Sequence, residues 1–387
     1  MTFQRQRVLV SGASVAGLTA AYWLAKYRFE VTVVESSDGL RPGGQALDVR
    51  GPALEVARRM GVLEDLRRHT TDLLGMSMVD ESGTEVYRTT ERTLTGGRFE
   101  SEDLEVLRDD LVAVLRTAVP DDVTFVFSDR ITGISDDGPD GMQVMFEHSL
   151  TSRFDFVVGA DGSHSGVRRI VFGPEKPFRK YMGDYVAVLT IPNFLELDRW
   201  QTFHMGDGGG VGIIGPSKDQ DARAYLGFSS AEEVEYDYHD SDAQKRLLAE
   251  RLAGTGWVAP QVLEHMWEAT SFHFDARFQV LMDHWTRGRV ALVGDAGYAV
   301  SLTTGQGTSI AMVGAYVLAG ELASARGDLA AGARSYEVAI REYVLWNQAA
   351  ARALNEQDDA GAEPGLFADF GSLVEEITLR EYPVTLR

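Results

Sequence analysis

The 387-residue sequence predicts an α/β fold. A Rossmann-like dinucleotide-binding domain is joined to a second, α+β domain on a mostly antiparallel sheet, and a long C-terminal helix follows. Three observations lead to this prediction: a glycine-rich turn between a strand and a helix near the N-terminus, alternating apolar and polar residues in mid-chain, and helical periodicity near the C-terminus. With 44% apolar and 25% charged residues, the chain can bury a sizeable core.

The charge balance and the cysteine count exclude several classes of function. The formal net charge of −21 argues against nucleic acid and anionic membranes as partners, since both favour Lys and Arg. With no cysteine, the chain has no disulfides, thiolate metal sites or cysteine nucleophiles. No signal peptide and no run of 18 apolar residues is visible. We therefore expect a cytoplasmic protein without a metal, either a monomer or a weak homo-oligomer.

A glycine-rich turn lies in the stretch VSGASVAG, residues 10–17. Gly12 and Gly17 take the first and third glycine positions of the G-x-G-x-x-G pattern, and Ser14 takes the second. The first glycine permits the tight turn, and the third permits close packing of the helix on the strand. Serine adds only a small side chain beside the pyrophosphate and can donate to it. The turn is therefore expected to bind a dinucleotide.

The flanking residues supply the strand–turn–helix–strand context that the pattern requires. An apolar run ends at Val10, helical periodicity follows the turn, and FEVTVVE at 29–35 is typical of a buried strand. Val15 and Ala16 open the helix, whose free N–H groups and dipole favour phosphate. Glu35 ends the second strand about 20 residues after the turn, where a carboxylate accepts from ribose hydroxyls.

Four later stretches extend this pattern along the chain. Residues 43–66 combine a glycine pair, an alternating run and a helix, and residues 104–115 (LEVLRDDLVAVL) predict an amphipathic helix with Arg108 near its start. Residues 154–169 predict a buried strand that ends in an Asp-Gly pair. Residues 288–322 predict a strand that ends in Gly-Asp, a glycine-containing loop and a long helix.

Together and in this order, these motifs resemble those of the single-component FAD-dependent aromatic hydroxylases, typified by p-hydroxybenzoate hydroxylase. The similarity is greatest to the compact branch that includes tetracycline-inactivating monooxygenases, and it covers nearly the whole chain. The resemblance implies FAD as the bound cofactor and NADPH or NADH as the electron donor. Only one glycine fingerprint is visible, which fits a nicotinamide cofactor that binds transiently.

The resemblance also implies a set of FAD contacts. Arg108 would reach the pyrophosphate or the ribityl chain, and Asp295 would accept from a ribityl hydroxyl. The helix that follows Gly307 would point its N-terminus at the flavin and stabilise negative charge on the reduced ring. The implied FAD-binding residues are Gly12, Ser14, Val15, Ala16, Gly17, Glu35, Gly44, Asp48, Arg108, Asp161, Gly162, Gly294, Asp295, Gly305, Gly307 and Thr308.

Three of the implied positions have plain structural alternatives. Asp161 matches an Asp-Gly motif thought to serve both FAD and the nicotinamide cofactor, and it can equally be a turn aspartate. Arg41 and Arg168 are candidate cations for the phosphates of the nicotinamide cofactor, and each can equally be a surface arginine.

The chain departs from the family pattern beside the flavin. Where the family commonly has a proline pair next to the flavin C4a atom, this chain has Ser301 and Leu302. The candidates near C4a are therefore Ser301 and Gly305. No side chain need be a nucleophile, because the flavin carries the chemistry.

Residues 170–269 carry no cofactor motif. The alternation at 184–191, 209–215 and 222–230 predicts strands of a sheet laid over the flavin. Such a sheet can line an apolar pocket for a substrate. The candidate lining residues are Tyr185, Phe203, His204 and Phe228, and for each of them a place in the core or on the surface is the alternative.

These assignments divide the chain into three parts. We expect a discontinuous FAD-binding domain at 1–69, 98–169 and 270–330, and a substrate domain at 70–97 and 170–269. Residues 331–387 form the C-terminal helix and tail.

The resemblance implies a monooxygenase that consumes NAD(P)H and O2. It would hydroxylate an aromatic or polyketide-like small molecule through a flavin C4a-hydroperoxide. Three alternatives remain open: an FAD-dependent dehydrogenase or oxidase acting on a similar substrate, a flavin-bound binding protein without turnover, and a geranylgeranyl-reductase-like enzyme that shares the FAD fold.

Overall fold

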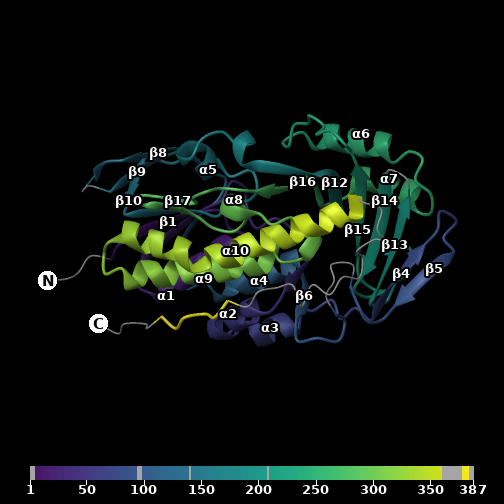
Figure 1. Ribbon diagram of the computed structural model, residues 1–387, viewed down its shortest axis with the longest axis horizontal. Coiled ribbons are helices and arrows are strands. Elements are labelled where there is room, and N and C mark those ends of the chain that lie inside the picture. The colour runs from purple at the N-terminus through teal and green to yellow at the C-terminus, as the bar shows by residue number, and fades with distance from the viewer. Residues whose placement is uncertain (1–4, 94–97, 139–140, 207–208, 360–376, 383–387) are drawn as a thin grey trace.

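The computed structural model describes residues 5–93, 98–138, 141–206, 209–359 and 377–382 (Figure 1). Two large sheets dominate this part of the chain, and the long helix α10 (Leu329–Asp359) runs beside α9 (Gly307–Ser324). The predicted α/β class is confirmed. The predicted C-terminal tail falls largely at 360–376 and 383–387, outside the described residues.

The first large sheet is the predicted Rossmann-like unit. Its order is β17–β18–β11–β1–β2–β7, and all neighbours are parallel except the β17–β18 pair. Helix α1 (Val15–Lys26) connects β1 to β2 and packs against α9, so nearly all of its residues are buried. The strands are β1 (Arg7–Ser11), β2 (Glu30–Val34), β7 (Thr124–Val126), β11 (Phe156–Gly159), β17 (Thr286–Arg287) and β18 (Val290–Leu292).

The second large sheet is the predicted antiparallel one. Its order is β16–β12–β15–β14–β13–β4–β5, and only the β13–β4 pair is parallel. Helices α6 (Ser241–Arg251) and α7 (Ala259–Glu268) pack against it, as Figure 1 shows. The strands are β4 (Gly75–Val79), β5 (Glu85–Thr89), β12 (Arg179–Ile191), β13 (Trp200–Gly206), β14 (Gly209–Gly215), β15 (Ala222–Ser229) and β16 (Phe272–Val280).

A small two-stranded sheet lies between these two parts of the chain. Strand β3 (Ala46–Val49) pairs with β6 (Leu104–Leu107), and helix α4 (Arg108–Ala118) follows β6 directly. The prediction of one helix over 104–115 was therefore wrong for its first four residues. Leu104 and Val106 share one buried face of the strand while Glu105 lies on the other, and this stretch satisfies its backbone by pairing with β3 instead.

The remaining elements support these sheets. Helices α2 (Pro52–Met60) and α3 (Leu63–Arg67) follow β3. Helix α5 (Gly166–Val171) packs against β8 (Ile131–Asp136), the edge strand of a three-stranded sheet in the order β10 (Ser152–Phe154), β9 (Met142–Phe146) and β8. The other elements are the short helix α8 (Asp295–Tyr298) and the 3₁₀ turns η2 (Lys176–Phe178) and η3 (Leu302–Thr304).

Helix α10 connects the two large sheets. The Gln348 amide on α10 donates to the Val280 carbonyl at the end of β16 (2.7 Å), and Arg277 of β16 donates to Asn355 (2.8 Å). The other end of α10 packs along α9, which itself contacts α1. The helix therefore fixes the antiparallel sheet relative to the nucleotide-binding half.

Candidate cofactor and substrate site

The turn between β1 and α1 has no space for side chains at its first and third glycines. Gly12 has φ +102°, and a Cβ there would lie 2.4 Å from the Ala160 carbonyl oxygen. A Cβ on Gly17 would lie 1.9 Å from the Gly12 carbonyl oxygen. Ser14 is the N-cap of α1, yet its side chain makes no capping bond. The serine is thus compatible with the turn, and its hydroxyl makes no capping hydrogen bond to the N-terminus of α1.

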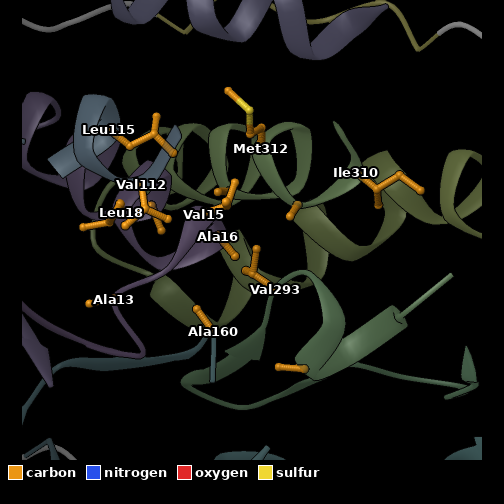
Figure 2. Packing of buried hydrophobic residues seen from close by; sticks show 14 of the residues in the cluster. Ala13, Val15, Ala16, Leu18, Val112, Leu115, Ala160, Val293, Ile310 and Met312 are labelled. Carbon is orange, nitrogen blue, oxygen red and sulfur yellow. The ribbon is translucent and has the colours of Figure 1, made fainter. Parts of the chain in front are cut away.

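Small side chains form the floor of this turn. Figure 2 shows Ala13 and Ala16 in the same buried cluster as Ala160 and Val293, which follow β11 and β18. The carboxyl ends of these parallel strands therefore meet the N-terminus of α1. This edge of a doubly wound sheet is where nucleotides bind.

Glu35 lies where the sequence predicted it, beside the turn. Its Oε2 accepts from the Ala13 N–H at 2.8 Å, and its Oε1 accepts from the Ser37 N–H at 3.0 Å. The carboxylate is therefore held against the turn in a fixed orientation. It also remains partly exposed.

Two arginines clamp the Gly43-Gly44 loop that precedes β3. Arg108, the first residue of α4, donates to the Gly43 carbonyl (3.1 Å) and the Arg41 carbonyl (2.7 Å). From β15, Arg223 donates to the Gly44 carbonyl at 3.2 Å. A Cβ on Gly44 would lie 2.3 Å from Arg108 Nε, so this position needs glycine. Burial lowers the pKa of Arg108, with Arg41 acting in the same direction, and the arginine still remains a cation.

Asp295 is distinguished by its exposure. It is the one exposed residue in the stretch from Val290 to Val300. Protein nevertheless surrounds the carboxylate closely enough to raise its pKa, an effect that nearby Asp275 reinforces. Asp295 therefore opens α8 as an exposed residue beyond the end of β18, directly after Gly294 (φ +64°).

The loop between α8 and α9 has an unusual backbone. Ser301 has φ +84° and Gly305 has φ +64°, and the first of these is strained for a residue with a side chain. A Cβ on Gly305 would lie 2.3 Å from Asp48 Oδ2, so Gly305 and Asp48 face each other directly. Gly307 opens α9 with no atom within 4 Å of a built Cβ, and Thr308 is buried behind it. The start of α9 thus presents bare backbone to an open space.

Asp161 and Arg168 are both engaged inside the protein. Asp161 accepts from the Ser165 hydroxyl (2.5 Å) and the Val167 N–H (3.0 Å) at the start of α5. Arg168 is fully buried and donates to the carbonyls of Ala296 (2.8 Å) and Ser163 (2.6 Å). Arg168 therefore does not reach the surface, and its hydrogen bond to Ala296 connects α5 to α8. Gly162 (φ +79°) has open space around it.

Arg41 is exposed, unlike Arg168. It lies near His273 of β16, whose pKa is lowered by the surrounding protein and, among charged neighbours, by Arg41 and Arg108. Like Asp295, His273 is exposed although protein surrounds it closely. His273 is not visible as a site residue in the sequence, because it comes close to Arg41 and Arg108 only through the pairing of β16 with β12.

The four predicted substrate residues separate onto two faces of the antiparallel sheet. Tyr185 and Phe228 are buried and stacked, with ring centroids 4.8 Å apart, in the core cluster that also includes α6 and α7 residues. His204 is buried and bonded through Nδ1 to the Val79 carbonyl. Phe203 alone packs in a separate small cluster, which includes Leu73.

A cavity of about 300 Å³ adjoins this small cluster. Its walls include Asp48, Arg50, Thr71, Leu73, Phe99 and Glu105. Sequence reasoning missed Arg50 and Glu105. The signal available was the alternation of LEVL at 104–107, which marks a strand whose polar residue shares a face with Asp48.

None of the helices that the structure describes is long and apolar enough to cross a membrane. The described residues also contain no group of three His, Asp or Glu side chains arranged to hold a metal ion.

The residues present fit FAD. The glycine turn excludes side chains beside the N-terminus of α1, the exposed Asp295 offers acceptors directly after β18, and the start of α9 at Gly307 is open. Arg108 supplies a partly buried cation nearby in the fold. These are the donors, acceptors and open space that a dinucleotide requires.

Comparisons with known proteins agree with this site. Residues 5–336 match the family model described as FAD binding domain. An uncharacterized protein of Mycobacterium tuberculosis is 48% identical, over 97% of this chain and 99% of its own length. A flavin-dependent monooxygenase from an unknown prokaryotic organism is 38% identical, over 89% of this chain and 88% of its own length.

Solved structures also show similarity to FAD-dependent enzymes. The crystal structure of tetracycline destructase Tet(51) superposes with a TM-score of 0.87 at 31% identity, covering 98% of this chain and 100% of that one. Tetracycline destructase Tet(55) has a TM-score of 0.85 at 34% identity, covering 99% and 100%. The chain therefore belongs to the FAD-binding-domain family and is an FAD-dependent monooxygenase.

Proposed function

We propose that this monooxygenase takes electrons from NADPH or NADH and hydroxylates an aromatic or polyketide-like small molecule with O2. The observation that carries the proposal is the close approach of the α1 turn, the end of β18 and the start of α9: a Cβ on Gly294 would lie 3.2 Å from the Cβ atoms of both Ala16 and Ala311, and Gly307 is open. The resemblance of the whole chain to flavin-dependent monooxygenases and tetracycline destructases supports the substrate class.

In this proposal the chain's residues position the cofactor. The N–H groups that follow Gly12 hold the pyrophosphate, Glu35 the adenosine ribose, and Arg108 the pyrophosphate or ribityl chain. Asp295 would accept from a ribityl hydroxyl, and the N-terminus of α9 would stabilise negative charge on the ring edge. FAD, when bound, would supply the redox chemistry between the nicotinamide cofactor and O2.

Several features favour transient binding of the nicotinamide cofactor. Among the described residues, one sheet has the parallel Rossmann-like order, and FAD would use it. Arg41 is exposed near His273, and it is the better placed of the two arginines considered for the cofactor's phosphates, because Arg168 is buried. Asp161 is engaged with α5, so its proposed role is to shape the loop at Gly162.

Oxygen labelling tests the proposal. The purified protein should be yellow with a flavin spectrum, and a phenolic substrate that accelerates NADPH oxidation should yield a product containing one atom from ¹⁸O2. Full turnover without label would indicate a dehydrogenase or an oxidase. NADPH consumption that stays at the no-substrate rate across a broad phenolic panel would favour a flavin-bound binding protein.

A further inference from the structure

The cavity beside β3 and β6 contains two carboxylates that face each other. Asp48 and Glu105 are directly opposite in the register of the antiparallel pair, an arrangement that is unfavourable for like charges. Asp48 Oδ1 lies 3.0 Å from Arg50 Nη2, and both of these side chains are about nine-tenths buried. The hydrogen bond to Glu105 comes from a neutral group, the Thr71 hydroxyl, at 2.7 Å.

Glu105 is therefore positioned to act as a general base in the cavity. Burial, and then the charge of Asp48, raise its pKa to about 7, against the opposing effects of Thr71 and Arg50. Part of its side chain remains open to the cavity. Burial and a like charge both favour the protonated acid, which is how a carboxylate becomes an effective proton acceptor near neutral pH.

The same cavity adjoins the loop proposed to flank the flavin. Arg50 donates from its backbone N–H to the Ser309 hydroxyl (2.9 Å) and from Nη1 to the Thr304 carbonyl (3.3 Å). Asp48 faces Gly305. A ligand in the cavity would therefore touch side chains that are bonded directly to the turn before α9.

The lining also includes apolar side chains. Leu73 and Phe99 line the cavity, and Phe203 packs against Leu73 in the same small cluster. A planar ring can rest on apolar side chains while a few polar groups fix its orientation. The other charged groups that face the cavity are Arg67, Asp72, Arg98 and Asp103, and Tyr225 of β15 lies near Glu105 on the sheet side.

We propose that this cavity binds the substrate as a phenol or enol against Leu73 and Phe99, and that Glu105 accepts the proton of its hydroxyl group. The substrate O–H bond breaks, a Glu105 carboxyl O–H bond forms, and no electrons leave either molecule. The negative charge moves from Glu105, where Asp48 repels it, to the substrate, whose ring carbons become more nucleophilic. This inference rests on the proposed function.

The first experiment tests occupancy of the cavity and uses the absence of cysteine from the chain. Leu73→Cys places a single thiol on the cavity wall, and Val338→Cys on the exposed face of α10 is the control. We expect tetracycline, used as the phenol–enol probe, to slow labelling of Leu73→Cys by monobromobimane at least tenfold and to leave Val338→Cys unaffected. Equal labelling rates with and without tetracycline would overturn the cavity assignment.

The second experiment tests Glu105 itself. In the FAD-loaded wild type, the rate of tetracycline-stimulated NADPH oxidation should rise as pH passes through about 7. Glu105→Gln should lose this rise and be roughly 10²-fold slower above it. Glu102→Gln, on the exposed loop nearby, should match the wild type.

The outcomes separate this inference from the proposed function. A wild type without flavin, or one that does not oxidise NADPH, contradicts the proposed function. A Glu105→Gln variant with normal FAD content and an unchanged pH profile overturns the role of Glu105 alone. A merely structural Glu105 would lower the rate equally at every pH, which also overturns it.

Discussion

The nucleotide-binding half and the antiparallel sheet differ in how the sequence places its residues. In the first half, local backbone geometry makes the site: Gly12 and Gly17 lie within the turn that they shape. In the second, Phe203 packs in the small cluster beside the cavity while Phe228 and Tyr185 lie in the main core, although all three are aromatic residues on strands. A site made by a local turn can be predicted from a motif, and a site made by a sheet face cannot.

The largest effect on FAD binding should come from filling the turn. Gly17→Ala places a methyl group 1.9 Å from the Gly12 carbonyl oxygen, so either the helix or the turn must move, at a cost of about 1–3 kcal/mol or more. We expect loss of FAD, measured as the ratio of flavin to protein absorbance after dialysis. Gly39→Ala is the control, since a Cβ there meets nothing within 4 Å. Full flavin occupancy in Gly17→Ala would show that the turn does not bind the cofactor.

Tyr185→Ala tests the assignment of this aromatic residue to the core. Removing a fully buried ring should lower the free energy of unfolding by about 3–5 kcal/mol. FAD per folded molecule should not change, because Tyr185 packs with Phe228 and Phe274. Urea unfolding measures the first quantity and absorbance the second. If the variant has wild-type stability but an altered substrate preference, Tyr185 belongs to the substrate site and not to the core.

Arg108→Ala and Asp295→Ala test the two charged groups of the nucleotide half. Each change removes charge-assisted hydrogen bonds worth about 1.5–3 kcal/mol, so each should weaken FAD binding roughly 10- to 150-fold. Titration of the apoprotein with FAD measures this affinity. Arg108→Lys keeps the charge but loses the forked geometry, and it should fall between the wild type and Arg108→Ala. Unchanged FAD affinity in both alanine variants would show that Arg108 and Asp295 do not bind the cofactor.

A smaller, pH-dependent effect is expected at His164, between the two halves. Burial opposes its protonation, but hydrogen bonds to Asp275 and Glu175 outweigh burial and raise the pKa to about 9 from 6.5. Protonated His164 therefore stabilises the fold fully below pH 6.5, and this stabilisation is lost as pH rises through 9. The stability advantage of the wild type over His164→Gln should shrink across that window in urea unfolding. A constant difference would mean that His164 is not protonated in this cluster.

Much of the fold could be predicted from the sequence because its signals are local. The strand–turn–helix–strand unit at the N-terminus, the strands at 184–191 and 209–215 and the long C-terminal helix all lie where their periodicity indicated. The helix predicted over 104–115 is the exception. Its first four residues form β6, because pairing with β3 outweighed a helical pattern.

The sequence by itself determined the nucleotide-binding turn, its companion Glu35 and the place where α9 begins, since each depends on glycine or charge at fixed distances along the chain. Only the tertiary structure decided that Arg168 is buried, that Asp295 is exposed and that Glu105 lies opposite Asp48 in a cavity. These facts depend on which strand pairs with which and on which face each strand buries. Contacts between residues far apart in the chain set both, and a single sequence does not encode them at any fixed spacing.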